Sequence, residues 1–256
     1  MKKIGNSFII AFAMYSKIPM PRTEWTKDNM KYAMCFFPVI GAVIGAVILL
    51  WNYIQGYAGF GNSFYTVVLM MIPVLITGGI HLDGLLDTSD ALSSYKPMDQ
   101  KLEILKDSHA GAFAIIVGIC YFFLLFGCYS ETNARMLSVL AIGFMLSRAL
   151  SGLAIVSFRM AKNTGLAATF SDMAAKSRVK MVMIIYIILC AVGMILLEPV
   201  LGTVCFLSAL FMFAYYRHMS YQKFGGITGD LAGFFLQVCE LVMAAAVVTT
   251  AKIIGM

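Results

Sequence analysis

Residues 32–82 read YAMCFFPVIGAVIGAVILLWNYIQGYAGFGNSFYTVVLMMIPVLITGGIHL and contain no Asp, Glu, Lys or Arg. A charge-free run of roughly fifty residues has room for two helices of about 20 residues, the length that crosses a bilayer. Across the whole chain, 61% of the 256 residues are hydrophobic and 12% are charged, whereas soluble domains carry about 25% charged residues. This composition excludes a soluble globular enzyme, a disordered tail and a nucleic-acid-binding module.

The rest of the chain repeats this pattern of long apolar segments joined by short connections. Each segment approaches the length that a bilayer requires: 33–54, 64–80, 111–130, 136–157, 181–197, 200–216 and 233–251. Connections rich in Lys and Arg alternate with nearly uncharged ones, and the basic connections mark the cytoplasmic side. We therefore predict an all-α, polytopic membrane bundle of about seven transmembrane helices, forming a single domain over 1–256, with the N-terminus inside.

Two boundaries of this topology need comment. Glu198-Pro199 marks either a turn between two spans or a kink inside one, because proline breaks helices. The first fifteen residues faintly resemble a signal peptide, but their apolar stretch is short and is interrupted by Asn6 and Ser7. We predict instead an N-terminal amphipathic helix on the membrane surface, with an apolar face formed by Ile4, Phe8, Ala11 and Tyr15.

The densest polar feature is GGIHLDGLLDTSD, residues 78–90, which begins where an apolar span ends. Asp83, Asp87 and Asp90 are spaced i, i+4, i+7, so on a helix their carboxylates share one face. Carboxylates so placed repel one another, and a hard divalent cation such as Mg²⁺ or Ca²⁺ removes the repulsion. The alternative is an acidic helix N-terminus favoured by the helix dipole, which explains one or two aspartates but not three. His81 is a candidate base or phosphate contact, or only marks the membrane interface.

Two further groups of charged residues are candidates for phosphate binding. Lys106 and Asp107, in EILKDSHAG at 103–111, form either a surface ion pair of little energetic value or a phosphate-neutralising cation beside another metal ligand. Arg148 lies inside a predicted span, where a charge is costly and indicates a functional site. Arg159 follows eleven residues later on the same helical face, and two arginines facing one pocket suggest phosphate or pyrophosphate recognition.

The last polar cluster is FGGITGDLAG, residues 224–233, at the start of the final span. A glycine-rich backbone at a helix N-terminus can hold phosphate, although the run is not a Walker A loop; alone, it is equally a turn with a Thr or Asp cap. Asp230, and Glu240 within the apolar run, are further acidic candidates. All these groups lie on the predicted cytoplasmic side or near it, which predicts one site for carboxylate-held Mg²⁺ and a diphosphate substrate.

The order of these motifs resembles the cobalamin synthase family, the adenosylcobinamide-GDP ribazoletransferases. The resemblance covers nearly the whole chain and rests on 16–21, 37–41, 78–90, 103–111, 147–149 and 225–230. It implies an Mg²⁺-dependent enzyme of the prokaryotic inner membrane with its active site on the cytoplasmic side. Such an enzyme joins adenosylcobinamide-GDP to α-ribazole, or its 5′-phosphate, and releases GMP in the last steps of cobalamin (vitamin B12) biosynthesis.

The resemblance also implies roles for the candidate residues. A ribazole hydroxyl attacks the phosphorus on the cobinamide side, while the metal and arginines stabilise the GMP leaving group. The expected metal ligands are Asp83, Asp87, Asp90 and Glu240; the expected catalytic residues are His81, Asp107 and Asp230; the expected substrate-binding residues are Lys106, Arg148, Arg159, Gly225, Gly226, Thr228 and Gly229. Which carboxylate is a ligand and which a base stays open at this stage.

The expected partners are the two substrates and the lipid bilayer, and not nucleic acid. The sequence leaves open whether the chain forms a homo-oligomer or associates with other enzymes of cobalamin assembly. One alternative is a CDP-alcohol phosphatidyltransferase, whose typical run D-x-x-D-G-x-x-A-R differs from D-G-x-x-D-x-x-D here. A membrane transporter is a second, less favoured alternative because the chain shows no convincing inverted repeat.

Overall fold

The computed structural model describes residues 2–107 and 109–256. Within these ranges every regular element is a helix, and one isolated parallel bridge joins Met160 to Ile227. The predicted all-α polytopic bundle is therefore confirmed. The long helices are α3 (Phe37–Ala58), α4 (Asn62–Thr77), α7 (Ala112–Ser130), α8 (Ala134–Ser157), α10 (Lys176–Leu197), α11 (Pro199–Phe224) and α12 (Gly229–Ile253).

Six helical segments are long and apolar enough to cross a membrane, and a seventh crossing exists if one bent pair counts as a span. That pair is α4 followed by α5 (Ile80–Ser93), and the two helices meet at 95°. The bend needs Gly78 and Gly79, whose φ angles of 67° and 80° lie in the left-handed region that favours glycine. As a result α5 leaves the direction of α4 just before the aspartate stripe.

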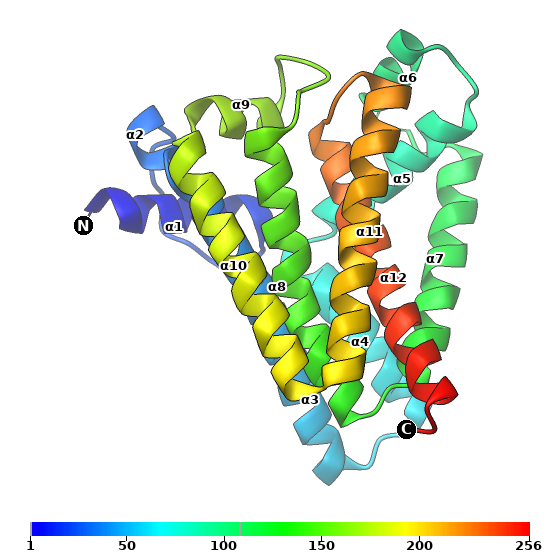
Figure 1. Cartoon of the computed structure of the whole chain (residues 1–256). Coiled ribbons are helices and arrows are strands. Elements are labelled where there is room, and N and C mark those ends of the chain that lie inside the picture. Colours follow the sequence, from blue (N-terminus) through cyan, green and yellow to red (C-terminus); the bar gives the residue numbers. More distant parts are fainter. Residues whose placement is uncertain (1, 108) are drawn as a thin grey trace.

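The two ends of the bundle differ in charge, as the positive-inside rule predicts. The connections at 59–61, 131–133 and 198 lie at the same end as the C-terminus, whereas the short helices α2 (Lys27–Met30), α6 (Met98–Ile104) and α9 (Leu166–Met173) lie toward the other end (Figure 1). The C-terminal end carries Arg135 and Lys252, and each forms an ion pair, with Glu198 and Glu131 respectively. Most of the 19 Lys and Arg residues therefore lie toward the opposite end, which we call the basic end.

Helix α8 lies at the centre, packed against α3, α10, α11 and α12. It approaches α3 backbone to backbone, since a Cβ on Gly41 would lie 2.2 Å from the Phe144 carbonyl oxygen and one on Gly45 2.4 Å from that of Ala141. The outer side of α10 exposes large apolar side chains, as a helix facing lipid does: Ile184, Ile185, Ile188, Leu189, Val192 and Leu196.

The predicted N-terminal helix is present as α1 (Lys2–Tyr15), which runs roughly across the direction of the long helices (Figure 1). Its apolar face is shifted from the expected one. Ser7, Ile10 and Ala11 are buried, while Ile4 remains 54% exposed. The helix is followed by a loop, by α2 and by the short 3-10 helix η1 (Ala33–Phe36), and it packs against both of these short helices.

The helices α10, α11 and α12 extend beyond the apolar segments that identified them. At Glu198 the chain turns, because α10 ends at Leu197 and α11 begins with Pro199 at its first position. The connection from α11 to α12 shrinks to 225–228, since polar turns continue both helices past the apolar region. Hydropathy identified only the apolar part of each helix, which is the part expected to lie in lipid, whereas the helices themselves are longer.

Candidate active site

The candidate site is built on a close crossing of α5 and α12. A Cβ on Gly84 would lie 2.6 Å from the Asp230 carbonyl oxygen, and one on Gly233 would lie 3.0 Å from that of His81. Only glycine permits such an approach of two backbones. The crossing sets Asp83 on α5 near Asp230 on α12, so acidic residues from distant parts of the sequence meet at the basic end.

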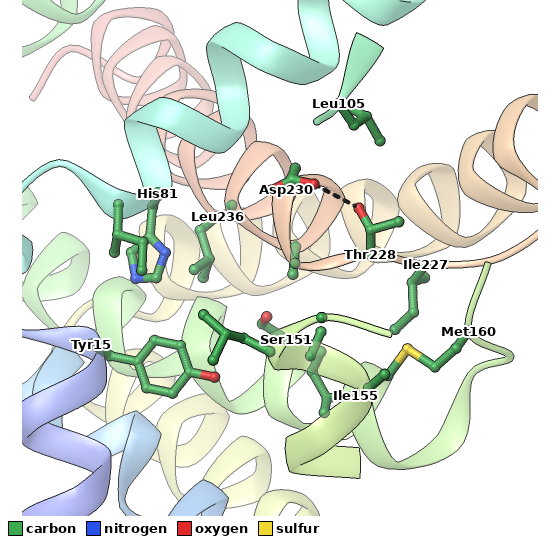
Figure 2. A pocket seen from close by; sticks show the side chains of 18 of the residues that line it. Tyr15, His81, Leu105, Ser151, Ile155, Met160, Ile227, Thr228, Asp230 and Leu236 are labelled. Carbon is green, nitrogen blue, oxygen red and sulfur yellow. Dashed lines mark hydrogen bonds between the residues drawn. The ribbon is translucent and has the colours of Figure 1, made fainter. Parts of the chain in front are cut away.

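A cavity of about 420 Å³ lies beside this crossing, within the range of about 300–1,000 Å³ that is typical of ligand sites. It is enclosed by the end of α1, the start of α3, α5, the second half of α8, the loop 158–165, α9 and the start of α12. Six of the residues predicted from the sequence line it: His81, Asp83, Lys106, Thr228, Gly229 and Asp230. Figure 2 shows Tyr15 and His81 toward one end of this cavity, Thr228 toward the other, and Ser151 between them.

The outer part of the cavity holds charges of both signs. The Thr228 hydroxyl caps α12 by accepting from the Leu231 N–H at 3.2 Å and lies 3.4 Å from the Asp230 carboxylate. Lys162 donates to the Leu102 carbonyl at 2.5 Å. Burial and the neighbouring Lys106 ammonium lower the pKa of Lys162, while the negative charges of Asp230 and Glu103 act in the opposite direction. Two ammonium groups held together at a helix N-terminus form a favourable place for an anion.

The three aspartates of the predicted stripe have different surroundings. Asp83 lines the cavity and is exposed. Asp87 is half-buried and faces the negative charges of Asp83, Asp90 and Asp230. Asp90 instead accepts hydrogen bonds from the backbone N–H groups of Gly111, at 2.5 Å, and Ala114, at 2.9 Å. The Asp90 carboxylate thereby satisfies N–H groups at the start of α7, so its stabilising role is structural.

Arg148 and Glu240 are partners of each other and not of the cavity. The Arg148 Nη1 donates to Glu240 Oε1 at 2.6 Å, the Ser147 hydroxyl donates to the same oxygen at 2.8 Å, and the two charged side chains are 0% and 6% exposed. Neither residue is among those that line the cavity. The structure thus corrects the expected placement of Glu240 beside the aspartates, because a buried guanidinium already neutralises its carboxylate.

Arg159, Gly225 and Gly226 shape the wall of the site without lining the cavity. Arg159 is exposed, donates from Nε to the Gly225 carbonyl at 2.8 Å and stacks its guanidinium 5.2 Å from the Tyr221 ring centre. A Cβ on Gly226 would lie 2.5 Å from the Arg159 carbonyl oxygen. Glycine therefore permits the backbone pairing of residues 159–161 with Ile227. This pairing fixes the loop that carries Lys162. Neither Arg148 nor Arg159 lines the cavity, so the expectation that the two arginines face one pocket is wrong.

Asp107 lies in the exposed loop before α7. It accepts from the His109 backbone N–H at 3.0 Å and lies 2.8 Å from the His109 ring nitrogen, and these hydrogen bonds lower the pKa of Asp107. The cavity is lined by the neighbouring Lys106 and not by Asp107. The expected catalytic role of Asp107 thus gains no support from its position.

Comparison with known proteins places this sequence in a family. Residues 7–248 match the family described as Cobalamin-5-phosphate synthase. The chain belongs to this family. A relative from Lachnoclostridium phytofermentans, named Adenosylcobinamide-GDP ribazoletransferase, is 50% identical over 97% of this chain and 95% of its own length. Relatives of the same name from Clostridium botulinum and a Geobacillus species are 32% and 31% identical, each over 94% of this chain and 96% and 94% of their own lengths. No solved structure matches the chain.

Three further residues line the cavity, and they come from segments in which the sequence alone predicts no chemistry: Tyr15, Ser151 and Lys162. Tyr15 belongs to the expected apolar face of the N-terminal helix, Ser151 lies about one turn after Arg148, and Lys162 belongs to a basic connection that indicates only topology. The signal for Lys162 is the polar segment RMAKNTG, 159–165, which follows a span on the same side as the other candidates. No local signal distinguishes Tyr15 or Ser151, because their importance comes from what packs around them.

The donor set of the cavity fits one type of magnesium site. Among residues 2–107 and 109–256, no three His, Cys, Asp or Glu side chains are close enough to hold a metal ion by themselves. Asp83 and Asp230 nevertheless line the same cavity, and Mg²⁺ is commonly held by one or two carboxylates together with substrate phosphates. The described residues therefore fit an ion shared with a phosphorylated substrate and do not fit an all-protein cage.

Proposed function

We propose that this chain is an adenosylcobinamide-GDP ribazoletransferase. It joins adenosylcobinamide-GDP to α-ribazole, or to its 5′-phosphate, and releases GMP. The observation that carries the proposal is the cavity at the basic end, where Asp83 and Asp230 lie with Lys106 and Lys162 in a chain whose relatives bear this name. Paired carboxylates and ammonium groups suit the binding of a diphosphate whose charge must be neutralised during transfer.

The reaction is a substitution at the phosphorus bonded to the cobinamide side of the donor. A ribazole hydroxyl oxygen forms the new P–O bond, the bond to the GMP oxygen breaks, and GMP leaves with that electron pair. The cavity groups suited to accept the hydroxyl proton are His81 and the Asp230 carboxylate oxygen that would not hold the metal ion. Lys106 and Lys162 neutralise the phosphate oxygens, and Thr228 and Gly229 present the start of α12 to them.

Magnesium is part of this proposal. Asp83 and Asp230 are the residues that would hold Mg²⁺, and the ion, when bound, neutralises the diphosphate as a Lewis acid. Asp87 supports them by adding negative charge beside Asp83. The role of Asp90 as a ligand is less favoured, because both its oxygens already accept backbone hydrogen bonds.

We further propose that the protein lies in the inner membrane of a prokaryotic cell, with the cavity on the cytoplasmic side. The concentration of Lys and Arg at the cavity end supports this orientation. Association with itself or with other enzymes of cobalamin assembly stays a prediction. The two alternatives gain no support, since the candidate acids of the cavity lie at one end of the bundle and the relatives are named as ribazoletransferases.

The test measures GMP release by the purified protein in lipid nanodiscs. We expect release from adenosylcobinamide-GDP with α-ribazole or its 5′-phosphate in Mg²⁺, and none after chelation with EDTA. Absence of release with both acceptors would overturn the proposed activity. Binding of Mn²⁺ in the presence of donor, followed by electron paramagnetic resonance, tests the metal separately: Asp83→Asn should abolish it, and Asp99→Asn, an exposed carboxylate on α6, should not.

A further inference from the structure

The inner part of the cavity contains buried polar atoms that form no hydrogen bond with the described residues. His81 and Ser151 are 4% and 1% exposed, and His81 Nε2 and Ser151 Oγ have no hydrogen-bond partner among the described residues. Both residues line the cavity, together with Tyr15 at the end of α1 (Figure 2). Buried polar atoms are nearly always paired in folded proteins, so the unpaired Ser151 hydroxyl in particular points to a ligand that supplies its missing partner.

The walls of this inner part are aromatic and apolar. The Tyr15 and Phe37 ring centres are 4.5 Å apart, and the Tyr15 and His81 rings lie within 23° of parallel with centres 6.2 Å apart. Phe37 and His81 meet edge to face at 5.8 Å. We call this region the aromatic recess; its lining is completed by Met34, Ser151, Ile155 and Leu236. Rings gathered in this way favour a flat aromatic ligand.

The recess lies deeper in the bundle than the charged residues. Ser151 lies about two turns before the end of α8, which runs toward the basic end and is followed by the loop that carries Lys162. Leu236 comes about two turns after Gly229 on α12, which runs away from the basic end. The charged groups Asp230 and Lys162 belong to the outer part of the same cavity. A ligand with an aromatic end and a polar end would therefore enter with the aromatic end first.

Both substrates of the proposed reaction carry an aromatic base, and the polar groups of the recess distinguish them. Guanine presents O6 and N7 as acceptors and an exocyclic amino group as a donor, and a buried guanine needs partners for all of them. The recess offers the hydroxyls of Tyr15 and Ser151 and the imidazole of His81. The carboxylates that would accept from the guanine amino group, Asp83 and Asp230, belong to the outer part of the cavity. The benzimidazole of a ribazole is apolar apart from one acceptor nitrogen, which a single hydroxyl satisfies.

We propose that the aromatic recess binds the base of the acceptor ribazole, with the Ser151 hydroxyl donating a hydrogen bond to the ring nitrogen that carries no sugar. The identity of the acceptor rests on the proposed function, whereas the preference for an apolar aromatic base rests on the recess itself. In this arrangement the ribose extends toward Asp230 and Lys106, and the donor diphosphate occupies the outer part of the cavity. Tyr15, Phe37 and His81 pack against the base and set its orientation.

The experiment measures binding of α-ribazole to the nanodisc protein by calorimetry, without donor, and compares Ser151→Ala with Ser138→Ala. Ser138 lies on the same helix, outside the cavity, and donates to the Ala134 carbonyl. We expect Ser151→Ala to weaken binding about tenfold, the value of one buried hydrogen bond, and Ser138→Ala to leave it unchanged. The KM of the donor should be the same in both variants.

A second probe needs no substitution in the protein. An indole riboside replaces the acceptor nitrogen of the base with a C–H group, so the wild-type protein should bind it about tenfold more weakly than α-ribazole. Ser151→Ala should bind the two ligands equally. Equal binding by the wild-type protein would overturn the hydrogen bond assigned to Ser151.

A third variant tests the location of the base. Ile155→Phe fills the recess, and Ile142→Phe makes the same change at a partly buried position of α8 outside the cavity. We expect Ile155→Phe alone to weaken α-ribazole binding more than tenfold. A raised donor KM with unchanged α-ribazole binding would assign the recess to guanine and overturn the proposal. Ribazole binding without any GMP release would instead reject the proposed activity and leave the recess assignment standing.

Discussion

Two acidic residues on α12, Asp230 and Glu240, show how the same charge serves different purposes. Glu240 is 6% exposed, and its carboxylate is neutralised by Arg148 at 2.6 Å within the bundle. Asp230 is half-buried at the cavity, and among the described residues the neutral Thr228 hydroxyl donates a hydrogen bond to its carboxylate at 3.4 Å. A buried charge that the protein has already paired belongs to the scaffold, whereas a charge left at a cavity is available to a ligand.

The comparison extends to the groups around each residue. Ser147 and the Phe144 carbonyl also bond to the Arg148–Glu240 pair, so its geometry is fixed by the protein. At the cavity, Asp83 and Asp87 add further negative charge near Asp230, and Lys162 sits beside a second lysine. Like charges held together destabilise a protein by themselves and become favourable when a ligand of opposite charge binds. The following substitutions test whether the two groups really differ in this way.

The largest expected effect is that of Asp83→Asn on catalysis. The substitution keeps the size of the side chain but removes a charge from the cavity, so we expect GMP release to fall about 10³-fold, as when an electrostatic catalytic group is removed. The melting temperature should stay close to that of the wild-type protein, because Asp83 is exposed. Asp99→Asn is the matched control. Retained turnover in Asp83→Asn would remove this residue from the site.

The next largest effect is that of Arg148→Met on stability. Loss of the guanidinium leaves the Glu240 carboxylate buried without a counter-charge, which costs about 3–5 kcal/mol. The double variant Arg148→Met/Glu240→Leu should recover most of this loss, since both charges are then absent. Thermal unfolding in nanodiscs measures both values. If the Arg148→Met variant unfolds like the wild-type protein but has a much higher donor KM, then Arg148 binds the substrate and is not part of the scaffold.

Lys162→Gln should weaken donor binding without affecting the fold. A hydrogen bond to a charged group contributes about 1.5–3 kcal/mol, so the KM of the donor should rise at least about tenfold. Lys176→Gln, at an exposed position at the start of α10, is the control and should leave the KM unchanged. An unchanged KM in Lys162→Gln would show that Lys162 contacts no phosphate.

Lys162 also predicts a dependence on pH. Burial and the charge of Lys106 lower the pKa of Lys162 below 10.5, against the opposing charges of Asp230 and Glu103. Because phosphate binding needs the protonated ammonium, which is present below the pKa, the donor KM should rise as pH increases through that lowered pKa. Lys162→Arg should move the rise to higher pH, since arginine stays charged. The same alkaline profile in both proteins would exclude Lys162 as the source.

The smallest expected effect is that of Asp90→Ala. The Asp90 carboxylate accepts from two backbone N–H groups at the start of α7, and loss of such a cap costs about 1 kcal/mol. We expect a correspondingly lower melting temperature and turnover within about tenfold of the wild-type value. A loss of turnover as large as that of Asp83→Asn would restore Asp90 as a ligand and show that the stripe acts as a unit.

The sequence by itself determined the class of protein, the approximate number of membrane spans and the end at which the site lies. These features follow from hydropathy and from the distribution of Lys and Arg, which are local properties of the chain. The motif order that indicates the family could likewise be identified without coordinates, whereas the structure decided that Glu198-Pro199 is a turn and not a kink. Residues 83–90 do lie on one helix, which is the condition under which the three aspartates share a face.

Only the tertiary structure decided which polar residues meet. The α5–α12 crossing at Gly84 and Gly233 brings Asp83 close to Asp230. Asp90 instead accepts a hydrogen bond from the Gly111 N–H at the start of α7. An intramembrane arginine had to find some partner because of its desolvation cost, but whether that partner was a substrate or Glu240 depended on helix packing. Contacts of this kind join residues far apart in the chain, so no pattern of spacing or hydropathy records them.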